Sequence, residues 1–175
     1  PIFIKNNGQF NSKIEYKLTI NAGEVFFENN KITYNLFQKD ILNEIKHNAK
    51  NTKKALRGHA YEVVFNQSNQ NIKPYGTNKN SAYNNYFIGN DTTKWKANVP
   101  SFKELNYDNI YDGIDLKYYE KNGELKYDFI VGTNANPDLI KMFYQGLDSI
   151  YKLRGNLILK NSLGSVIEQK PYAYQ

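Results

Sequence analysis

Hydrophobic and polar residues alternate along much of the chain, as they do in strands that bury one face. The first clear run places apolar residues at every second position of 14–20. Two further strands are predicted at 24–28 and 31–37, joined by Asn29–Asn30, because an asparagine pair can adopt the positive φ angles of a tight hairpin. The chain is therefore expected to open as a β-meander.

The stretch 113–131 carries the most specific structural signal. Its Asn122–Gly123 pair predicts a two-residue turn, and this turn fixes which residues of the two strands face each other. One face then holds the apolar pairs Ile114–Val131, Leu116–Phe129 and Tyr118–Tyr127, and the other holds the charge pairs Lys117–Asp128 and Lys121–Glu124. A shift by one residue would turn the apolar side chains into water. Asn122, Gly123 and Gly113 are therefore expected to have structural roles.

Between and after these hairpins the pattern changes several times. Residues 38–57 are polar and lysine-rich with apolar residues at helical spacing, which predicts one short amphipathic helix or an insertion. A strand is predicted at 59–66, and 67–80 is expected to be a loop because it is polar throughout. Another strand is predicted at 139–145, and a second hairpin at 156–169.

Strands spaced about ten residues apart with little helix indicate an all-β fold. We expect an antiparallel β-sandwich or barrel-like fold with one short helix or insertion near 38–57. The length of 175 residues fits one domain over 1–175, with a C-terminal continuation left open.

Composition excludes several classes of function. The chain has no cysteine, so a disulfide framework, a zinc ribbon and a thiol nucleophile are excluded. Its net charge of +6 comes almost entirely from lysine, whereas specific recognition of bases and phosphates favours the arginine fork. No apolar run approaches the roughly 18 residues that cross a bilayer. We therefore expect no nucleic-acid partner, no membrane span and no cofactor.

Acidic residues and histidines offer only limited metal chemistry. Asp108, Asp112 and Asp115 cluster around a glycine, and carboxylates near such a turn could hold calcium. Their spacing does not match the calcium-loop signature, however, and Asp and Gly also mark ordinary turns. The two histidines, His47 and His59, lack a partner at metal-ligand spacing, and His59 is better explained as a cap or an edge residue of a strand.

Two further groups of side chains could bind or cleave a glycan. Glu120 with Glu124 or Asp128 could form the acid pair of a glycoside hydrolase, provided that they face a cleft. Aromatic residues make up 15% of the chain, and exposed rings could stack on sugars. The rings singled out as candidate ligand contacts are Trp95, Tyr86, Tyr111 and Tyr119. Tyrosines of β proteins also commonly pack in the core and keep their hydroxyls at its rim.

Several motifs resemble one domain family of exported Bacteroidota surface proteins. They are the start 3–9 (Phe-Ile-Lys-Asn-Asn-Gly-Gln), the stretch 84–100 with Asn-Asn-Tyr-Phe-Ile-Gly-Asn-Asp, the stretch 109–116 with Asn-Ile-Tyr-Asp-Gly-Ile-Asp-Leu, the strand 127–131, and the close 164–175 with Pro-Tyr-Ala-Tyr-Gln. The family lies near the mature N-terminus of large proteins that carry SBBP repeats and are linked to gliding motility and type IX secretion. It has no assigned catalytic residues.

The resemblance implies a location and a class of function. The chain is expected to lie at the cell surface or outside the cell, exported with a cleaved signal peptide, which agrees with its start at Pro1 without a methionine. The expected function is a non-catalytic structural or interaction domain, and not an enzyme. Its partners would be other surface or secretion-system proteins, or further domains of the same polypeptide. A glycan-binding module with a polysaccharide partner is the alternative, and a carboxylate-dependent hydrolase comes third.

Overall fold

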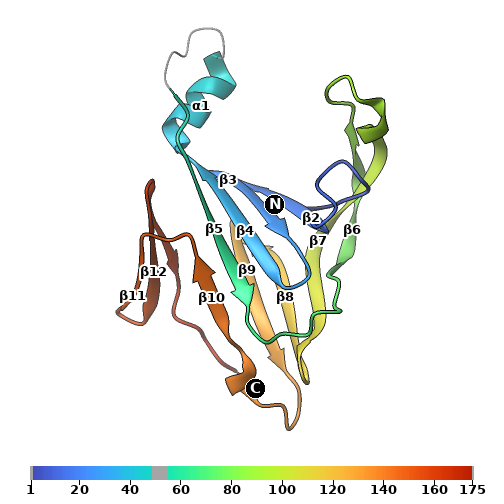
Figure 1. The fold of residues 1–175 in the computed structure, drawn as a ribbon. Coiled ribbons are helices and arrows are strands. Elements are labelled where there is room, and N and C mark those ends of the chain that lie inside the picture. Colours follow the sequence, from blue (N-terminus) through green and yellow to red (C-terminus); the bar gives the residue numbers. More distant parts are fainter. Residues whose placement is uncertain (1, 49–54, 175) are drawn as a thin grey trace.

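The computed structural model describes residues 2–48 and 55–174 and confirms an antiparallel all-β fold (Figure 1). Most strands belong to one curled sheet that forms a half-barrel. Its strands are β1 (Phe3–Lys5), β2 (Tyr16–Ile20), β3 (Gly23–Phe27), β4 (Lys31–Phe37), β5 (Gly58–Phe65), β6 (Tyr75–Tyr86), β7 (Lys96–Tyr111), β8 (Ile114–Lys121), β9 (Glu124–Val131) and β10 (Met142–Gln145).

The long strand β7 organises the half-barrel because it belongs to two walls. The strand order is β10-β5-β4-β3-β2-β1-β7-β8-β9, and β6 pairs with β7 outside this path. Glu104 of β7 pairs with β6 on one side and β8 on the other, while Phe102 pairs with β6 on one side and β1 on the other. Strands β1 and β8 therefore share one edge of β7, and the sheets that continue from them face each other.

The hydrophobic core fills the space between these two walls. Rings of opposite walls meet there: Phe27 of β3 lies 5.3 Å from Tyr118 of β8, centroid to centroid, and Phe65 of β5 lies 6.5 Å from Phe129 of β9. Tyr107 is fully buried, and its hydroxyl donates a hydrogen bond of 3.0 Å to the backbone carbonyl of Glu28. The alternating apolar positions thus supply both the packing and one polar tie across the core.

The predicted register of the 113–131 hairpin is confirmed pair by pair in β8 and β9. The turn residues Asn122 and Gly123 have φ angles of 55° and 80°, as a two-residue hairpin turn requires. The charges do not follow the simplest pairing, however. Lys117 lies opposite Asp128, yet its ammonium is 2.8 Å from the carboxylate of Glu104 on β7, and Glu124 pairs with Lys126 at 2.6 Å.

Three sequence-based predictions needed correction. The supposed loop 67–80 contains the start of β6, whose polar residues become a strand by pairing with β7, so tertiary pairing overrides a weak β propensity. The strand predicted at 139–145 is shorter, because the 3-10 turn η2 (Pro137–Leu139) precedes β10. Asn29–Asn30 joins β3 to β4 as expected, but neither asparagine has a positive φ.

The predicted helix at 38–57 is present as α1 (Lys39–Asn48). It starts directly after β4, and Ile41 is buried as its apolar spacing indicates. The central part of the predicted segment, 49–54, lies outside the described residues. Within the part of the chain that the structure describes, no helix has the length and apolar character needed to cross a membrane.

A second sheet of three strands packs beside β10. It consists of β11 (Ser149–Leu153), β12 (Asn156–Asn161) and β13 (Gly164–Glu168), and its β12–β13 pairing confirms the second predicted hairpin. Leu159 is fully buried in a cluster with residues of β4 and β5. His59 adds a polar link, because its ring nitrogens lie 2.7 Å from the Gly146 carbonyl and 3.0 Å from the Ser162 hydroxyl.

Candidate functional site

A hairpin projects from the half-barrel and is the most prominent feature of the molecule (Figure 1). We call residues 79–103, the outer parts of β6 and β7 with their connection, the arm. The pairing of β6 with β7 is irregular, with register shifts between Lys79 and Tyr83 and between Asn84 and Tyr86. Such bulges twist a strand and keep its free edge from pairing with another sheet. The arm therefore offers its side chains, more than its backbone edge, to a partner.

The end of the arm exposes large apolar side chains. Tyr83, Phe87, Ile88 and Trp95 have exposed fractions of 62%, 58%, 77% and 40%, and we call these four residues the tip cluster. Isolated exposed apolar residues are normal, but a group of them on one projection indicates a contact surface. Tryptophan and tyrosine are also the residues that contribute most often to the energetic centre of protein interfaces.

Local contacts hold the tip in one conformation. The rings of Phe87 and Trp95 pack edge to face with centroids 5.8 Å apart, and the indole Nε1 of Trp95 donates to the Gly89 carbonyl at 3.2 Å. The short 3-10 turn η1 (Thr92–Lys94) is capped by Asp91, which accepts from the Thr93 amide at 3.1 Å. A preformed tip loses little conformational entropy when it binds.

The N-terminal loop packs against the arm where β6 ends, next to the tip cluster. Phe10 packs edge to face on Tyr86 with centroids 5.4 Å apart. The loop is ordered by Asn6, whose side chain donates to the carbonyls of Asn11 and Ile14 and accepts from the backbone amide of Phe10. The direction of the arm is thus fixed by side-chain packing as well as by the strands.

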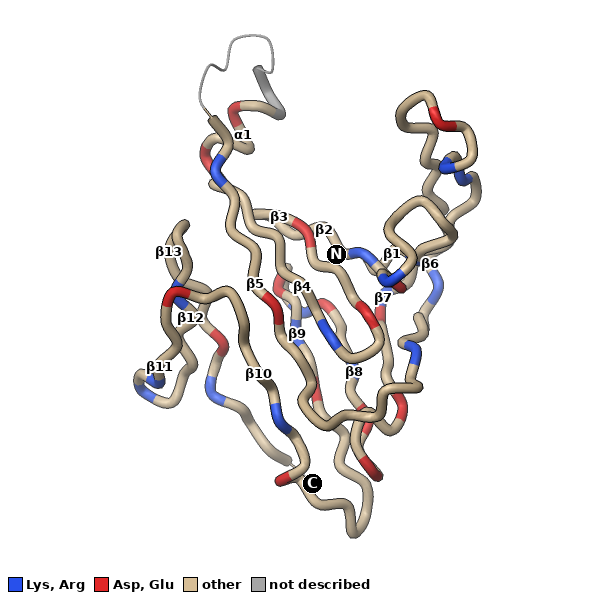
Figure 2. Tube along the Cα trace, in the orientation of Figure 1, with Lys and Arg blue, Asp and Glu red and all other residues tan. Residues whose placement is uncertain are grey.

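The arm is basic. It contains four lysines and one aspartate, a net charge of +3, and Figure 2 shows basic residues along both of its strands. Lys94 is 3.6 Å from the carboxylate of Asp91, and Lys96 donates to the Thr93 carbonyl at 2.9 Å. Lys79 and Lys103 have no ion-pair partner among the residues described. A complementary partner would therefore carry acidic groups around an apolar surface.

The four predicted aromatic contacts do not form one site. Trp95 is exposed in the tip cluster, as expected, whereas Tyr86, at the end of β6, is half-buried against Phe10. Tyr111 is buried, and its hydroxyl donates to the Lys141 carbonyl at 2.8 Å, so it is not an exposed ring. Tyr119 is half-buried on β8 beside Lys117.

The three aspartates considered for calcium do not converge. Asp108 accepts from the Tyr75 hydroxyl at 2.8 Å, and Asp115 accepts from the backbone amide of Asn109 at 2.7 Å. Asp112 is exposed in the turn between β7 and β8. Across residues 2–48 and 55–174, no group of three or more His, Asp or Glu side chains is placed to hold a metal ion. Gly113 has the structural role expected of it, because its φ of 68° forms this turn.

The carboxylates considered for glycoside hydrolysis serve the hairpin. Glu120 accepts from the Gly123 amide in the β8–β9 turn, and Glu124 binds Lys126. Burial and the nearby Asp128 carboxylate on the neighbouring strand raise the pKa of the Tyr119 hydroxyl. None of these three acids lines the surface hollow beside Lys13 and Glu28 or the one beside Asn109 and Asp112.

A half-buried acid that the sequence did not single out lies where the two sheets meet. Glu168 of β13 accepts hydrogen bonds through Oε2 from the hydroxyls of Tyr144, at 2.8 Å, and Tyr127, at 3.2 Å. Burial raises the pKa of the Glu168 carboxyl. Tyr127, Tyr144 and Glu168 form a cluster. They come from β9, β10 and β13, so only the folded arrangement of distant strands brings them together. This cluster joins the second sheet to the open side of the half-barrel.

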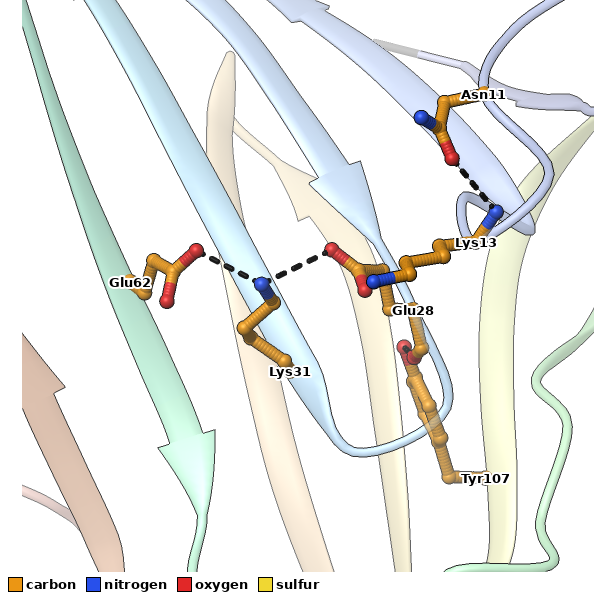
Figure 3. Close-up of polar contacts among 6 residues, drawn as sticks. All are labelled: Asn11, Lys13, Glu28, Lys31, Glu62 and Tyr107. Atoms are coloured by element: carbon orange, nitrogen blue, oxygen red, sulfur yellow. Dashed lines mark hydrogen bonds and ion pairs between the residues drawn. The ribbon is translucent and has the colours of Figure 1, made fainter.

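Charges on the outer face of β3, β4 and β5 form a further polar group. The Lys31 ammonium lies 2.8 Å from Glu62 and 3.4 Å from Glu28, and the Lys13 side chain points toward Glu28 (Figure 3). The hydrogen bond to Glu62 is the main cause of a raised pKa of Lys31. A shallow hollow of about 220 Å³ beside this group is lined by Asn11, Lys13, Ile14, Phe26, Glu28 and Thr33. Because Lys31 is paired with both carboxylates, we interpret this group as one that stabilises the sheet.

The fold and the arm define an all-β protein with a projecting, apolar-tipped hairpin. Residues 3–175 match the model of the family described as a domain of unknown function, DUF7948, and the chain belongs to that family. No curated protein and no solved structure matches the chain.

Proposed function

We propose that this domain is a non-catalytic interaction module of an exported cell-surface protein, and that the tip cluster is its contact surface. One observation carries the proposal: large apolar side chains are exposed together on an ordered, projecting hairpin. The location outside the cell, and the link to gliding motility and type IX secretion, rest on the resemblance of the sequence motifs. The carboxylates considered for catalysis are engaged in the hairpin or spread over exposed strands, which favours a role in binding.

The chemistry of the tip indicates the partner. Trp95, Phe87 and Ile88 would enter an apolar hollow, and the lysines of the arm would face acidic groups at its rim. We propose a protein partner, either another surface protein or a further domain of the same polypeptide. Because the charges are exposed, we expect association to be slower at high salt.

A photo-crosslinking experiment tests this proposal. A photo-reactive amino acid is placed at position 87 or, as a control, at position 167 of the full-length protein in the cells that produce it. Phe87 and Ile167 are equally exposed, at 58% each, but Ile167 lies on the second sheet, away from the arm. Position 87 is expected to give one dominant protein adduct that position 167 does not give.

Binding of the purified partner then measures the contribution of the tip. Trp95→Ala is expected to weaken binding at least tenfold, which corresponds to about 1.4 kcal/mol. Tyr172→Ala is the matched control, because Tyr172 is 85% exposed in the C-terminal segment and lies outside the arm. Equal adducts at both crosslinking positions, or unchanged binding by Trp95→Ala, would refute the proposal.

The exposed indole also keeps a glycan as the second candidate for the tip, since sugars stack on such rings. Titration with a panel of polysaccharides distinguishes this candidate. Affinity that is lost in Trp95→Ala would favour the glycan, as would the absence of a protein adduct. Binding of the tip to vesicles of phosphatidylethanolamine and phosphatidylglycerol would instead assign it to a membrane surface.

A further inference from the structure

A hollow of about 390 Å³ is lined by three segments of the chain. These segments lie at the end of the half-barrel opposite the arm (Figure 1). The segment after β5 contributes Gln67, Ser68 and Asn69 to it. The end of β7 and the turn that follows contribute Asn109, Tyr111 and Asp112, and η2 contributes Leu139. Its volume falls within the range of small-molecule sites.

The walls of the hollow are tied to one another. The backbone amide of Asn69 donates to the Ile110 carbonyl at 3.0 Å. Lys141, which follows η2, links this segment to both of the others. Its backbone carbonyl accepts from the Tyr111 hydroxyl at 2.8 Å, and its ammonium donates to the Gln67 side chain at 3.1 Å. Three segments that are distant in the sequence therefore form one braced concavity.

Several polar groups of the hollow are not used by the fold. Asp112 is exposed, and neither its carboxylate nor the carboxamide of Asn109 has a hydrogen-bond partner among the residues that the structure describes. The hydroxyl of Ser68, a residue only 6% exposed, is buried without a partner. Buried polar groups are nearly always hydrogen-bonded, so each exception calls for an explanation.

One residue of the lining also has an unfavourable backbone conformation. Gln67 has a φ of 60°, in the left-handed region that residues other than glycine and asparagine rarely adopt. Such conformations cost free energy and gather at sites of function. The fold thus holds unsatisfied polar groups beside one strained residue.

We infer that the hollow binds one residue of a neutral sugar, independently of the arm. Sugar hydroxyls both donate and accept, so a carboxylate acceptor beside carboxamides that do both is a suitable lining. Leu139, which is 37% exposed, supplies apolar surface for the C–H face of a sugar.

Other classes of ligand fit less well. A metal ion would find one free carboxylate, because Asp108 and Asp115 are bound elsewhere. An anion would meet the Asp112 carboxylate with no lysine or arginine in the lining. An apolar ligand would remove the hydrogen bonds that these polar groups make to water and would offer none in return.

Two-dimensional ¹H–¹⁵N NMR of the 175-residue chain tests the inference. The probes are D-glucose, D-galactose, D-mannose and N-acetyl-D-glucosamine at millimolar concentrations. At least one is expected to cause saturable shifts of the Asn69, Asn109 and Asp112 amides. Cellobiose and diacetylchitobiose distinguish the sources: tighter binding than the monosaccharide indicates the end of a polysaccharide, and equal binding indicates a free sugar.

Variants make the result specific. Asn109→Gly keeps a residue that favours positive φ while removing the carboxamide, so it is expected to fold and to lose at least tenfold in affinity. Asp112→Ala should lose as much, whereas Asp138→Ala, the same change of charge on η2 outside the lining, should bind normally. The inference is overturned if no sugar shifts these amides, if CaCl₂ shifts them instead, or if Asn109→Gly and Asp112→Ala bind as the wild type does.

Discussion

Replacement of Gly123 by valine tests the turn on which the whole β8–β9 register depends. Gly123 has a φ of 80°, and a Cβ atom built on it would meet no other atom within 4 Å. The Cβ position is therefore open, and backbone strain is the main cost of the substitution. Asn122 precedes it with a φ of 55°, so the two residues form a turn that needs positive φ at both positions.

The expected loss follows from two opposing effects. A residue other than glycine in the left-handed region costs about 1–3 kcal/mol, and valine is among the least suited because it is β-branched. Loss of glycine also reduces the entropy of the unfolded chain, which offsets about 0.4–1 kcal/mol. The net destabilisation should be about 1–2 kcal/mol, or a fall in Tm of about 2–8 °C for a chain of this size.

Urea and thermal unfolding of three proteins measure this effect. Gly123→Asn is the matched control, because asparagine tolerates the left-handed region, and it should remain within about 0.5 kcal/mol of the wild type. If Gly123→Val is as stable as the wild type, or if asparagine costs as much as valine, the reasoning about the turn is wrong.

Two further predictions concern polar groups that the fold buries wholly or in part. Tyr107→Phe leaves the Glu28 carbonyl without its buried donor and should lower the free energy of unfolding in urea by about 1–2 kcal/mol. Tyr75→Phe, which removes an exposed hydroxyl, is the control and should cost little. Equal losses in the two variants would contradict this prediction. Burial raises the pKa of Glu168 above its ordinary 4.5, so the fold favours the protonated carboxyl. The unfolding free energy of the wild type, relative to Glu168→Gln, should therefore fall as pH rises from 4.5 through the folded pKa, and a constant difference would reject the idea.

Local patterns were sufficient to predict much of the fold. Alternation with a strong turn signal gave the β8–β9 register, because one shifted residue would expose a whole apolar face. Strand β6 escaped prediction for the opposite reason: its sequence is polar, and only pairing with β7 makes it a strand. The partner of Lys117 was also missed, because Glu104 comes from β7 and a hairpin pattern contains no information about a third strand.

The candidate sites were harder to predict than the fold. Trp95 was singled out as an aromatic residue, but its prominence depends on the projection of the arm, which no local pattern reveals. Tyr111 was expected to be exposed and is buried, because period-two patterns do not show which tyrosines a second wall covers. The acid Glu168 and the strained residue Gln67 gave no sequence signal. Their importance arises from strands and loops that meet only after folding.

The most direct test of the central claim uses the tryptophan itself. Trp95 is the one tryptophan of the sequence and lies in the tip cluster, so its fluorescence reports on the tip alone. When the purified partner found by crosslinking at position 87 is added, the account predicts a blue shift of the emission and weaker quenching by acrylamide. Emission and quenching that stay unchanged while an independent assay shows full binding would contradict the claim that the tip is the contact surface.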